Sequence, residues 1–348
     1  MKIYMRAYLY ENLGDDLFVN ILTERYSKHK FYAITCGLNE YKNNAYYKNL
    51  KIVSSNKYVF RIIRKFKLEK IIANRLDLVV IIGGSMYIEA NEQDKEREFT
   101  IGKNKHYIIG TNFGPCTTDE YLNRVKKSFE NAEDVCFRES YSYNLFKDIN
   151  HVRFASDIIF SVDTSKIKKI DSKKVIISVV LCRRKSKIEY EEAYETKIIE
   201  MTKFFMNKGY EVTLMSFCKS EGDELAIQNI LEKCDEELKN KINTYFYRGD
   251  IDEAMNVMAD SQIIVGTRFH ANIIGMVLGK TVIPITYSKK TNNVLEDMNF
   301  KGKIIDLSKI DEFDIEKLSD ETLRYKIDIN KQKEDANRHF EKLDEVLK

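Results

Sequence analysis

The sequence has no excess of charge of either sign and no apolar run long enough to cross a membrane. Its 57 Lys and Arg side chains against 54 Asp and Glu leave a net charge of +3 over 348 residues, whereas nucleic-acid binders concentrate a clear basic excess. We therefore expect no nucleic-acid partner. Because no apolar run approaches the roughly 18 residues of a transmembrane helix, we expect a soluble or peripheral protein.

Disulfide, metal and secretion motifs are also lacking. The six cysteines show no C-x-x-C spacing, and the N-terminal MKIYMRAYLY is an amphipathic strand pattern rather than a signal peptide. These cysteines are Cys36, Cys116, Cys136, Cys182, Cys218 and Cys234. Reduced core thiols in a cytoplasmic protein are the expectation. No spacing such as H-E-x-x-H occurs, so we expect no metal and no cofactor.

Short β-rich runs alternate with segments of helical period, which is the pattern of parallel sheets covered by helices. The expected strands are KIYMRAY, LVVIIGG, HYIIGTN, DVCFRE and HVRFASD in the first half and KKVIISVVL, EVTLMSF, KINTYFY, SQIIVGT and KTVIPITY in the second. A helix is expected from Asp15 to His29, capped by Asp15 or Asp16. The chain therefore belongs to the α/β class with two domains.

The polar stretch SVDTSKIKKIDSKK marks the domain boundary. We predict a first domain over residues 1–162, a linker over 163–174, a second domain over 175–310 and a helical tail over 311–348 that packs back on the first domain. Ligands of open parallel sheets bind outside the carboxyl ends of the strands. We therefore expect the two sheets to face a central cleft, with the unusual residues at strand ends lining it.

Three strand ends of the first domain carry glycine or polar residues. Gly14 permits a tight turn before Asp15, which can cap a helix or face a ligand. Gly83 and Gly84 free backbone amides for an anion, although tight packing explains paired glycines equally well. Asn112, in GTNFGP, is the polar side chain of a turn that shapes a cleft wall.

Arginines follow two further strands. Arg138 can bind a carboxylate or a phosphate of a ligand through two parallel hydrogen bonds. A structural ion pair with Glu139 or Asp157 is an equal alternative. Asp157 closes its own strand. Arg183, just past the first strand of the second domain, is a candidate ligand contact or an ordinary exposed basic side chain.

The stretch VGTRFHANIIGMV is the strongest candidate site. A strand ends at Gly266, and Arg268 opens a helix whose positive N-terminus favours an anion. Arg268 adds a planar guanidinium that is always charged, and His270 adds an imidazole, a group that titrates near neutral pH. Tyr287 and Lys290 follow the next strand. The set suits an acidic substrate that also needs a proton.

The segment from Lys57 to Arg75 interleaves basic residues with Val, Ile and Phe. Such a basic amphipathic stretch can bind an anionic membrane surface. The alternative is a helix with an ordinary solvated basic face.

Together these motifs resemble the polysaccharide pyruvyl transferase family over nearly the whole chain up to about residue 300. The matching motifs are NLGDD, IIGGS, GTNFGP, FRESYSYNLF, ASD ending at Asp157, and GTRFHANIIGMVLGKTVIPITYSKK. The last block is the specific one, with the family's arginine, histidine, glycine, tyrosine and lysine at Arg268, His270, Gly279, Tyr287 and Lys290.

The resemblance implies two Rossmann-like domains arranged like the GT-B glycosyltransferases, the first binding the acceptor and the second the donor. It also implies transfer of a pyruvyl group from phosphoenolpyruvate to sugar hydroxyls of a cell-surface polysaccharide precursor. In this hypothesis His270 is the general acid and Arg268 the anion clamp, helped by Lys290 and Arg183. Asp15 or Asp157 orients or deprotonates the acceptor hydroxyl.

Two other functions fit the same residues. A GT-B glycosyltransferase with a nucleotide-sugar donor would use the same cations for a diphosphate, and a non-catalytic carbohydrate-assembly protein would keep the fold alone. With a lipid-linked acceptor, the segment 57–75 would hold the enzyme at the inner face of the cell membrane.

Overall fold

The computed structural model describes residues 1–35, 47–54, 57–66, 68–89, 101–168, 170 and 172–348. Cys36, Lys67 and the linker residues 169 and 171 lie outside the described residues. The chain divides into two compact units. Unit 1 comprises Met1–Tyr10, Asp15–Ser161 and Lys331–Lys348, and unit 2 comprises Glu11–Gly14 and Val162–Asn330.

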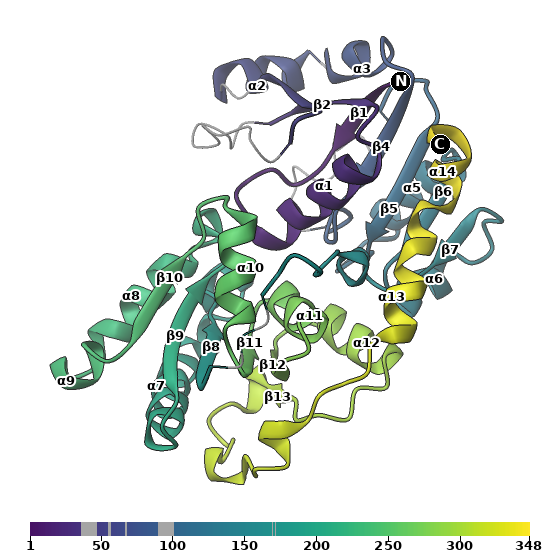
Figure 1. Cartoon of the computed structure of the whole chain (residues 1–348). Helices are drawn as coiled ribbons and strands as arrows, with labels where there is room; N and C mark the ends of the chain where they lie inside the picture. Colours follow the sequence, from purple (N-terminus) through teal and green to yellow (C-terminus); the bar gives the residue numbers. More distant parts are fainter. Residues whose placement is uncertain (36–46, 55–56, 67, 90–100, 169, 171) are drawn as a thin grey trace. The chain divides into compact units, whose positions relative to one another are not determined.

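Unit 1 is built on a parallel sheet with the strand order β3-β2-β1-β4-β5-β6-β7 (Figure 1). The strands are β1 (Lys2–Arg6), β2 (Lys30–Ile34), β3 (Leu50–Ser54), β4 (Leu78–Ile82), β5 (His106–Thr111), β6 (Asp134–Phe137) and β7 (Val152–Phe154). The central strands β4 and β5 are buried along their whole length, as expected for unbroken apolar runs covered on both faces. The strand order changes direction between β1 and β4, where ligands bind in sheets of this type.

The helices of unit 1 cover both faces of this sheet. They are α1 (Leu13–Arg25), α2 (Lys57–Lys65), α3 (Leu68–Ala73), α5 (Asp119–Glu130) and α6 (Ser140–Phe146), with a 3-10 turn η1 (Ile158–Ser161). Right-handed crossovers put α1 on one face and the other four on the opposite face. The face that carries α1 would thus stay bare over β5 and β6, and the segment Lys331–Lys348 covers it.

This C-terminal segment forms α13 (Asn330–Ala336), η8 (Asn337–Phe340) and α14 (Glu341–Leu347). Arg25 of α1 pairs with Asp344 at 2.6 Å. His339 has no exposed surface: its Nδ1 accepts from the amide of Gly110 at 3.3 Å, and its Nε2 lies 2.9 Å from the carbonyl oxygen of Ser156. The ring must be neutral to accept on one nitrogen and donate from the other.

Unit 2 repeats the plan with the strand order β10-β9-β8-β11-β12-β13, all pairs parallel. The strands are β8 (Lys174–Ser178), β9 (Glu211–Ser216), β10 (Asn243–Phe246), β11 (Ile263–Gly266), β12 (Thr281–Thr286) and β13 (Ile305–Asp306). The helices are α7 (Glu191–Asn207), α8 (Asp223–Glu232), α9 (Glu236–Lys239), α10 (Ile251–Ala259), α11 (Phe269–Val277) and α12 (Lys289–Asp297). The direction changes between β8 and β11.

Short 3-10 turns complete unit 2. They are η2 (Cys182–Lys185), η3 (Ile188–Tyr190), η4 (Lys219–Glu221), η5 (Leu307–Lys309), η6 (Ile315–Lys317) and η7 (Thr322–Arg324). The core of this unit includes Ile315, Leu318 and Leu323. Residues 311–330 therefore belong to unit 2, and only Lys331–Lys348 pack on unit 1, which corrects the expectation of a single helical tail over 311–348.

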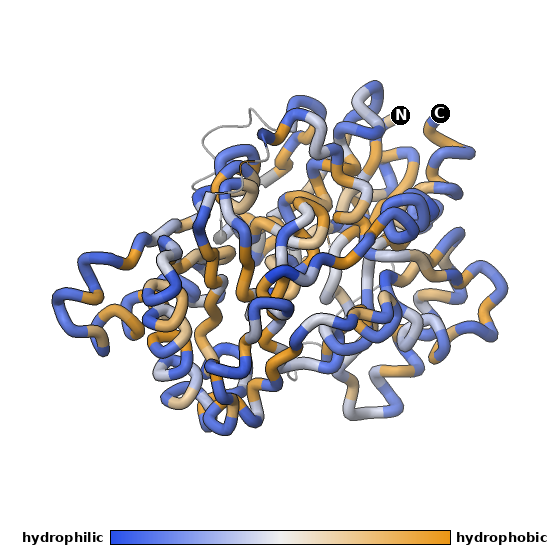
Figure 2. Tube along the Cα trace, turned by 60° about the horizontal axis from the view of Figure 1, so that its bottom comes forward, coloured by the Kyte–Doolittle hydropathy of each residue, from blue (hydrophilic) through white to orange (hydrophobic). Residues whose placement is uncertain are grey.

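All ten expected strands are present. Hydrophobic stretches (orange) alternate with hydrophilic ones (blue) along the chain (Figure 2). Three strands were not expected, namely β2, β3 and β13. The first helix begins at Leu13 rather than at Asp15. Asn12 does the capping, since its Oδ1 accepts from the amide of Gly14 at 3.2 Å.

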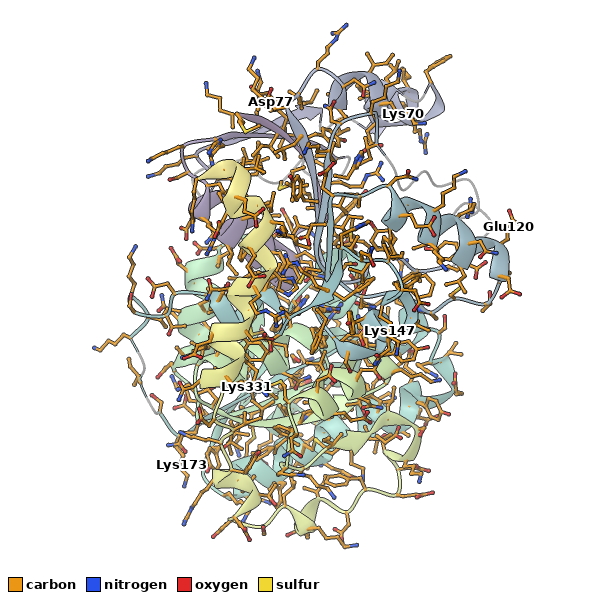
Figure 3. All side chains as sticks on the ribbon, turned by 90° about the vertical axis from the view of Figure 1, so that its right-hand side faces the viewer. Lys70, Asp77, Glu120, Lys147, Lys173 and Lys331 are labelled. Carbon is orange, nitrogen blue, oxygen red and sulfur yellow. The ribbon has the colours of Figure 1, made fainter. Side chains whose placement is uncertain are left out.

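Many charged side chains are exposed on both units, and none of the described cysteines forms a disulfide bond. Cys136, Cys182 and Cys218 are buried. Charged side chains such as Asp77, Glu120, Lys147, Lys173 and Lys331 occupy exposed positions (Figure 3). Over the residues that can be described, no helix combines the length and apolarity that crossing a bilayer requires.

The buried ring of His339 predicts a specific pH dependence of stability. Burial and the charge of Arg153 lower its pKa to about 3, against about 6.5 in the unfolded chain. Between these values the unfolded state binds more protons, so the contribution of His339 is complete above pH 6.5 and is lost as the pH falls. The free energy of unfolding of the wild type should therefore fall as the pH is lowered from 6.5. We expect His339→Gln to reduce the slope of this fall by up to about 1.4 kcal/mol per pH unit.

Urea unfolding of the wild type and of His339→Gln between pH 7 and pH 4 measures this difference. Parallel pH profiles for the two proteins would contradict the assignment of a neutral, buried ring.

Candidate active site

The turn from β11 into α11 lies at the point where the strand order of unit 2 changes direction. Gly266 pairs with Ser178 of β8, and the Ser178 hydroxyl accepts from the amides of Thr267 at 3.1 Å and Arg268 at 3.2 Å. A side chain on Gly266 would lie 2.1 Å from Oδ1 of Asn272. The Asn272 amide donates to the carbonyl oxygens of Gly266 and Arg268. Both strand ends therefore fix the start of α11.

The guanidinium of Arg268 is buried against two carboxylates. Its Nε donates to Asp223 Oδ2 at 2.9 Å, its Nη2 bonds the other oxygen of Asp223, and its Nη1 lies 2.5 Å from Glu221. Only 8% of the Arg268 side chain is exposed, and none of Asp223. Burial by itself would lower the pKa of Arg268, but the two carboxylates raise it well above its ordinary value. Arg268 is thus a neutralised, fixed cation.

Glu221 extends this cluster. It also pairs with Lys185, and Asn12 Nδ2 donates to its second oxygen at 3.4 Å. Burial opposes its ionisation, but the charges of Arg268 and Lys185 outweigh burial and hold its pKa far below the usual range. Two cations and two carboxylates cancel, so the cluster has no net charge.

His270 lies in the first turn of α11, half-buried, with its ring centroid 5.0 Å from that of Phe269. It packs directly on the backbone of Gly14, where an added Cβ would lie 1.7 Å from the imidazole Nδ1. Glycine is therefore required at position 14 because the imidazole occupies the place of a side chain. The segment Glu11–Gly14 belongs to unit 2, since Leu13 donates to the carbonyl oxygen of Phe217 at 3.2 Å.

Lys290 and Tyr287 follow β12 at the same edge of the sheet. Lys290 lies in the first turn of α12, with its Nζ 5.9 Å from the centroid of Phe269. This turn contains no acidic residue, and Ser288 stands at the N-cap without a side-chain capping bond. Tyr287 is half-buried and interacts electrostatically with Arg268. The N-termini of α11 and α12 thus bring His270, Tyr287 and Lys290 around Phe269 and Arg268.

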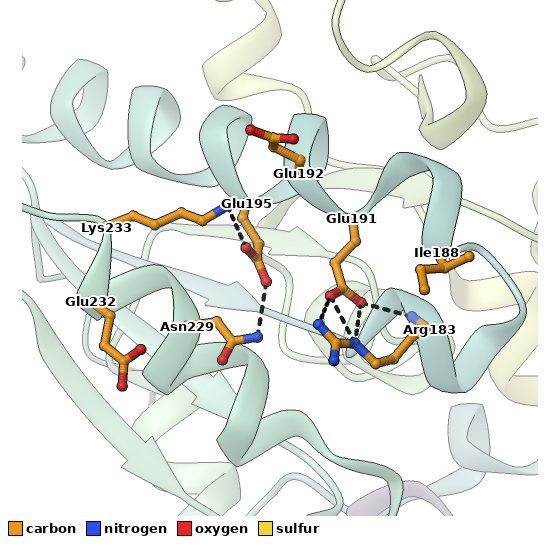
Figure 4. Close-up of a pocket in the computed structure, with 8 residues that line it drawn as sticks. All are labelled: Arg183, Ile188, Glu191, Glu192, Glu195, Asn229, Glu232 and Lys233. Carbon is orange, nitrogen blue, oxygen red and sulfur yellow. Dashed lines mark hydrogen bonds and ion pairs between the residues drawn. The ribbon is translucent and has the colours of Figure 1, made fainter.

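Arg183 lies in a different place from the one its sequence position suggested. Its guanidinium pairs with Glu191 at the start of α7, and the two residues line a pocket between α7 and α8 (Figure 4). Glu195, at the other end of this pocket, is bound by Asn229 at 3.2 Å and Lys233 at 2.8 Å. The cation of this loop that reaches the Arg268 cluster is Lys185.

Unit 1 holds a second buried arginine at its strand ends. Arg138 pairs with Asp157 at 3.1 Å and donates to Asn112 Oδ1 at 2.7 Å. The side chains of Arg138 and Asp157 are 1% and 0% exposed. Gly84 lies against the guanidinium, because an added Cβ would come within 2.4 Å of Arg138 Nη1. The structural alternative for this pair therefore applies, and Asp157 has no exposed surface with which to meet an acceptor.

Asp15 is the half-buried carboxylate at this edge of unit 1. A Cβ added to Gly83 would lie 3.7 Å from its Oδ1. Gly83 has a φ of +138°, a value that side-chain-bearing residues rarely adopt. Asp15 thus stands beside the glycine turn that follows β4, while the capping of α1 is left to Asn12.

The structure gathers the predicted residues into two groups, one in each unit. Gly14, Arg268, His270, Tyr287 and Lys290 form the group of unit 2. Asp15, Gly83, Gly84, Asn112, Arg138 and Asp157 form the group of unit 1. Sequence reasoning missed Lys185, Glu221 and Asp223. The acidic pair around Gly222, in the turn between β9 and α8, was the signal that could have revealed Glu221 and Asp223. In the described part of the chain, no cluster of three His, Cys, Asp or Glu could hold a metal ion.

The chain is similar to known proteins in both sequence and fold. A model of the polysaccharide pyruvyl transferase family matches residues 12–289. The fold is similar to UDP-GlcNAc 2-epimerase of Methanocaldococcus jannaschii in complex with UDP-GlcNAc and UDP, with 11% identity, a TM-score of 0.61 and coverage of 100% of this chain and 99% of that one. It is also similar to Anabaena Alr3699/HepE in complex with UDP and glucose, with 11% identity, a TM-score of 0.58 and coverage of 99% and 98%. These likenesses confirm the predicted class of two parallel α/β sheets and the GT-B type of fold.

The pairing of Arg268 predicts the effect of removing its partner. Asp223→Asn should lower the free energy of unfolding by about 3–5 kcal/mol, because the buried guanidinium loses its closest countercharge. Urea unfolding followed by circular dichroism measures this loss. Glu192→Gln, at an exposed glutamate of the α7 pocket, is the control and should leave stability unchanged. A loss below about 1 kcal/mol in Asp223→Asn would contradict a buried, structural ion pair.

Proposed function

Since the chain belongs to the polysaccharide pyruvyl transferase family, we propose that it moves the pyruvyl group of phosphoenolpyruvate onto two hydroxyls of a saccharide as a ketal and releases phosphate. The position of His270 carries the proposal. It is a titratable side chain in the first turn of α11, beside the point where the strand order of unit 2 changes direction. Ligands of parallel sheets bind at this point.

The donor needs cations for a carboxylate and a phosphate. Because Arg268 is held by Asp223 and Glu221, we assign it the role of a fixed charge that positions α11, in place of the direct clamp expected from the sequence. Lys290 and the N-terminal amides of α12 are the groups proposed to bind the anionic oxygens. Tyr287 adds a hydroxyl on the same side.

The reaction requires one proton at carbon. Protonation of the methylene carbon of phosphoenolpyruvate turns it into a methyl group and leaves an oxocarbenium-like centre at the neighbouring carbon. One saccharide hydroxyl adds there, phosphate departs, and a second hydroxyl closes the ketal. The two hydroxyls release two protons, of which one replaces the proton used and the other accompanies phosphate. His270 suits the role of general acid, because imidazole exchanges protons near neutral pH.

The acceptor in this proposal is a precursor of a cell-surface polysaccharide, and Asp15 is the half-buried carboxylate proposed to orient its hydroxyl. No cofactor takes part. The proposed location is the cytoplasm, with a lipid-linked acceptor bringing the enzyme to the inner face of the cell membrane.

A nucleotide-sugar transferase is the competing function. Its support is the fold likeness to proteins whose solved structures contain UDP, and a diphosphate would suit the same cations. Donor binding separates the two functions without knowledge of the acceptor, because a ligand that binds the native state raises its apparent stability.

We expect phosphoenolpyruvate to raise the thermal unfolding midpoint and UDP-sugars to leave it unchanged. Lys290→Gln should weaken the apparent affinity for phosphoenolpyruvate about tenfold, as the loss of one charged hydrogen bond would. Lys289→Gln is the matched control, since Lys289 is exposed in the same helical turn. Stabilisation by a UDP-sugar alone would replace this proposal with the glycosyltransferase, and no stabilisation by either would favour a non-catalytic role.

Removal of the general acid should separate binding from turnover. We expect His270→Gln to keep the stabilisation by phosphoenolpyruvate and to lower phosphate release about 10²–10⁴-fold. The assay uses phosphoenolpyruvate and a panel of methyl hexopyranosides with neighbouring hydroxyls. Gly14→Ala should show the same split, because the added methyl group would take the place of the imidazole. Full activity in both variants would exclude His270 as the acid.

A further inference from the structure

Exposed apolar side chains are concentrated in one short segment of unit 1. Among the described residues, 14 large hydrophobic side chains are exposed, and six of them lie between residues 53 and 71. They are Val53 (41%), Tyr58 (73%), Val59 (43%), Ile62 (51%), Phe66 (62%) and Ile71 (49%). With the exposed Arg61 and the half-buried Lys70, these six residues make up what we call the α2–α3 surface.

The apolar residues of α2 form one stripe. Tyr58, Ile62 and Phe66 follow each other at intervals of four residues, and such residues lie on the same face of a helix. The helical turn continues through Phe66, whose amide donates to the carbonyl oxygen of Ile62 at 3.0 Å. Ile63, by contrast, is only 7% exposed. The helix is thus anchored by Ile63 and presents a second apolar face outward.

The charge of this segment is strongly one-sided. Residues 57–75 contain seven Lys and Arg against a single acid, Glu69. Glu69 is neutralised within unit 1, because it pairs with Arg6 at 2.8 Å and accepts from the Tyr4 hydroxyl at 2.8 Å. The chain as a whole has a net charge of only +3, so this basic excess is local.

We propose that the α2–α3 surface docks on an anionic phospholipid bilayer. Aromatic and aliphatic side chains at the outer face of a basic helix enter the boundary between headgroups and acyl chains, while the cations contact the anionic headgroups. A second copy of this chain is a poorer occupant, because pairing through this face would oppose two basic segments. An acidic protein would match the charge but would not require the outward apolar stripe of Tyr58, Ile62 and Phe66.

This inference goes beyond the transfer reaction and does not depend on the donor. Docking on a bilayer would hold the enzyme at the membrane surface, where a lipid-linked saccharide would be located. Binding to vesicles needs neither phosphoenolpyruvate nor a saccharide, so its failure and a failure of the proposed reaction are separate results.

Flotation of the full chain with phosphatidylcholine vesicles, with and without phosphatidylglycerol, tests the proposal. We expect binding only with phosphatidylglycerol and a marked loss at high salt. Ile62→Ser with Phe66→Ser should weaken binding about a hundredfold, since each change removes an apolar group that would be buried. Arg61→Glu should weaken it roughly thirtyfold, because one attractive charge becomes repulsive.

The matched control is Leu145→Ser on α6 with Lys147→Glu at its C-cap, which changes an exposed apolar residue and an exposed cation of the same unit. Its binding should equal that of the wild type, and all variants should keep the wild-type unfolding midpoint. Three results would overturn the proposal: no binding of the wild type to phosphatidylglycerol vesicles, an equal loss in the control, or self-association that Phe66→Ser abolishes in a protein that ignores vesicles.

Discussion

A buried guanidinium has to be neutralised, and this requirement shapes the strand-end edge of both sheets. In unit 1 Arg138 is held by Asp157, and in unit 2 Arg268 is held by Asp223. A charge taken out of water is tolerated only with a partner and with its hydrogen bonds satisfied. The surrounding groups serve this end: the Asn112 amide oxygen in unit 1, and Glu221 with Lys185 in unit 2. The two arginines thus have a structural role, and neighbouring side chains such as His270 and Asp15 are the candidates for the chemistry.

The central strands were the easiest to predict, because their burial is complete on both faces. Such strands read as continuous apolar runs, as β4 and β5 do. The pattern fails for β2 and β3, because these strands lie toward one edge of the sheet and alternate buried with exposed positions, as in KFYAI. The start of α1 was misplaced for a local reason, since Asn12, Asp15 and Asp16 are all residue types that can cap a helix, and Asn12 is the one that does so.

The site was predictable in part, because parallel strands bring their ends to one edge. In unit 1 that geometry brings Arg138 together with Asp157. Gly14, expected at a strand end of the first domain, instead lies in unit 2 against His270. The partners of Arg268 could not be derived in the same way. Asp223 and Glu221 are more than forty positions away in the chain, and carboxylates are common after strands. Arg183 was the expected ligand contact, but it pairs with Glu191, and Lys185, which was not predicted, reaches the Arg268 cluster through Glu221. The direction of side chains in such a short 3-10 turn is decided by tertiary contacts.

The segment Lys331–Lys348 has a consequence for the order in which the protein is completed. It covers one face of β5 and β6, and it is synthesised after every residue of unit 2. A growing chain therefore has all of unit 2 available while unit 1 still exposes that face to solvent. Domains generally fold in the order of their synthesis, but here the second unit can reach its native state first. Until residues 331–348 have been synthesised, the face of β5 and β6 that they cover stays open, and unit 1 cannot complete its core.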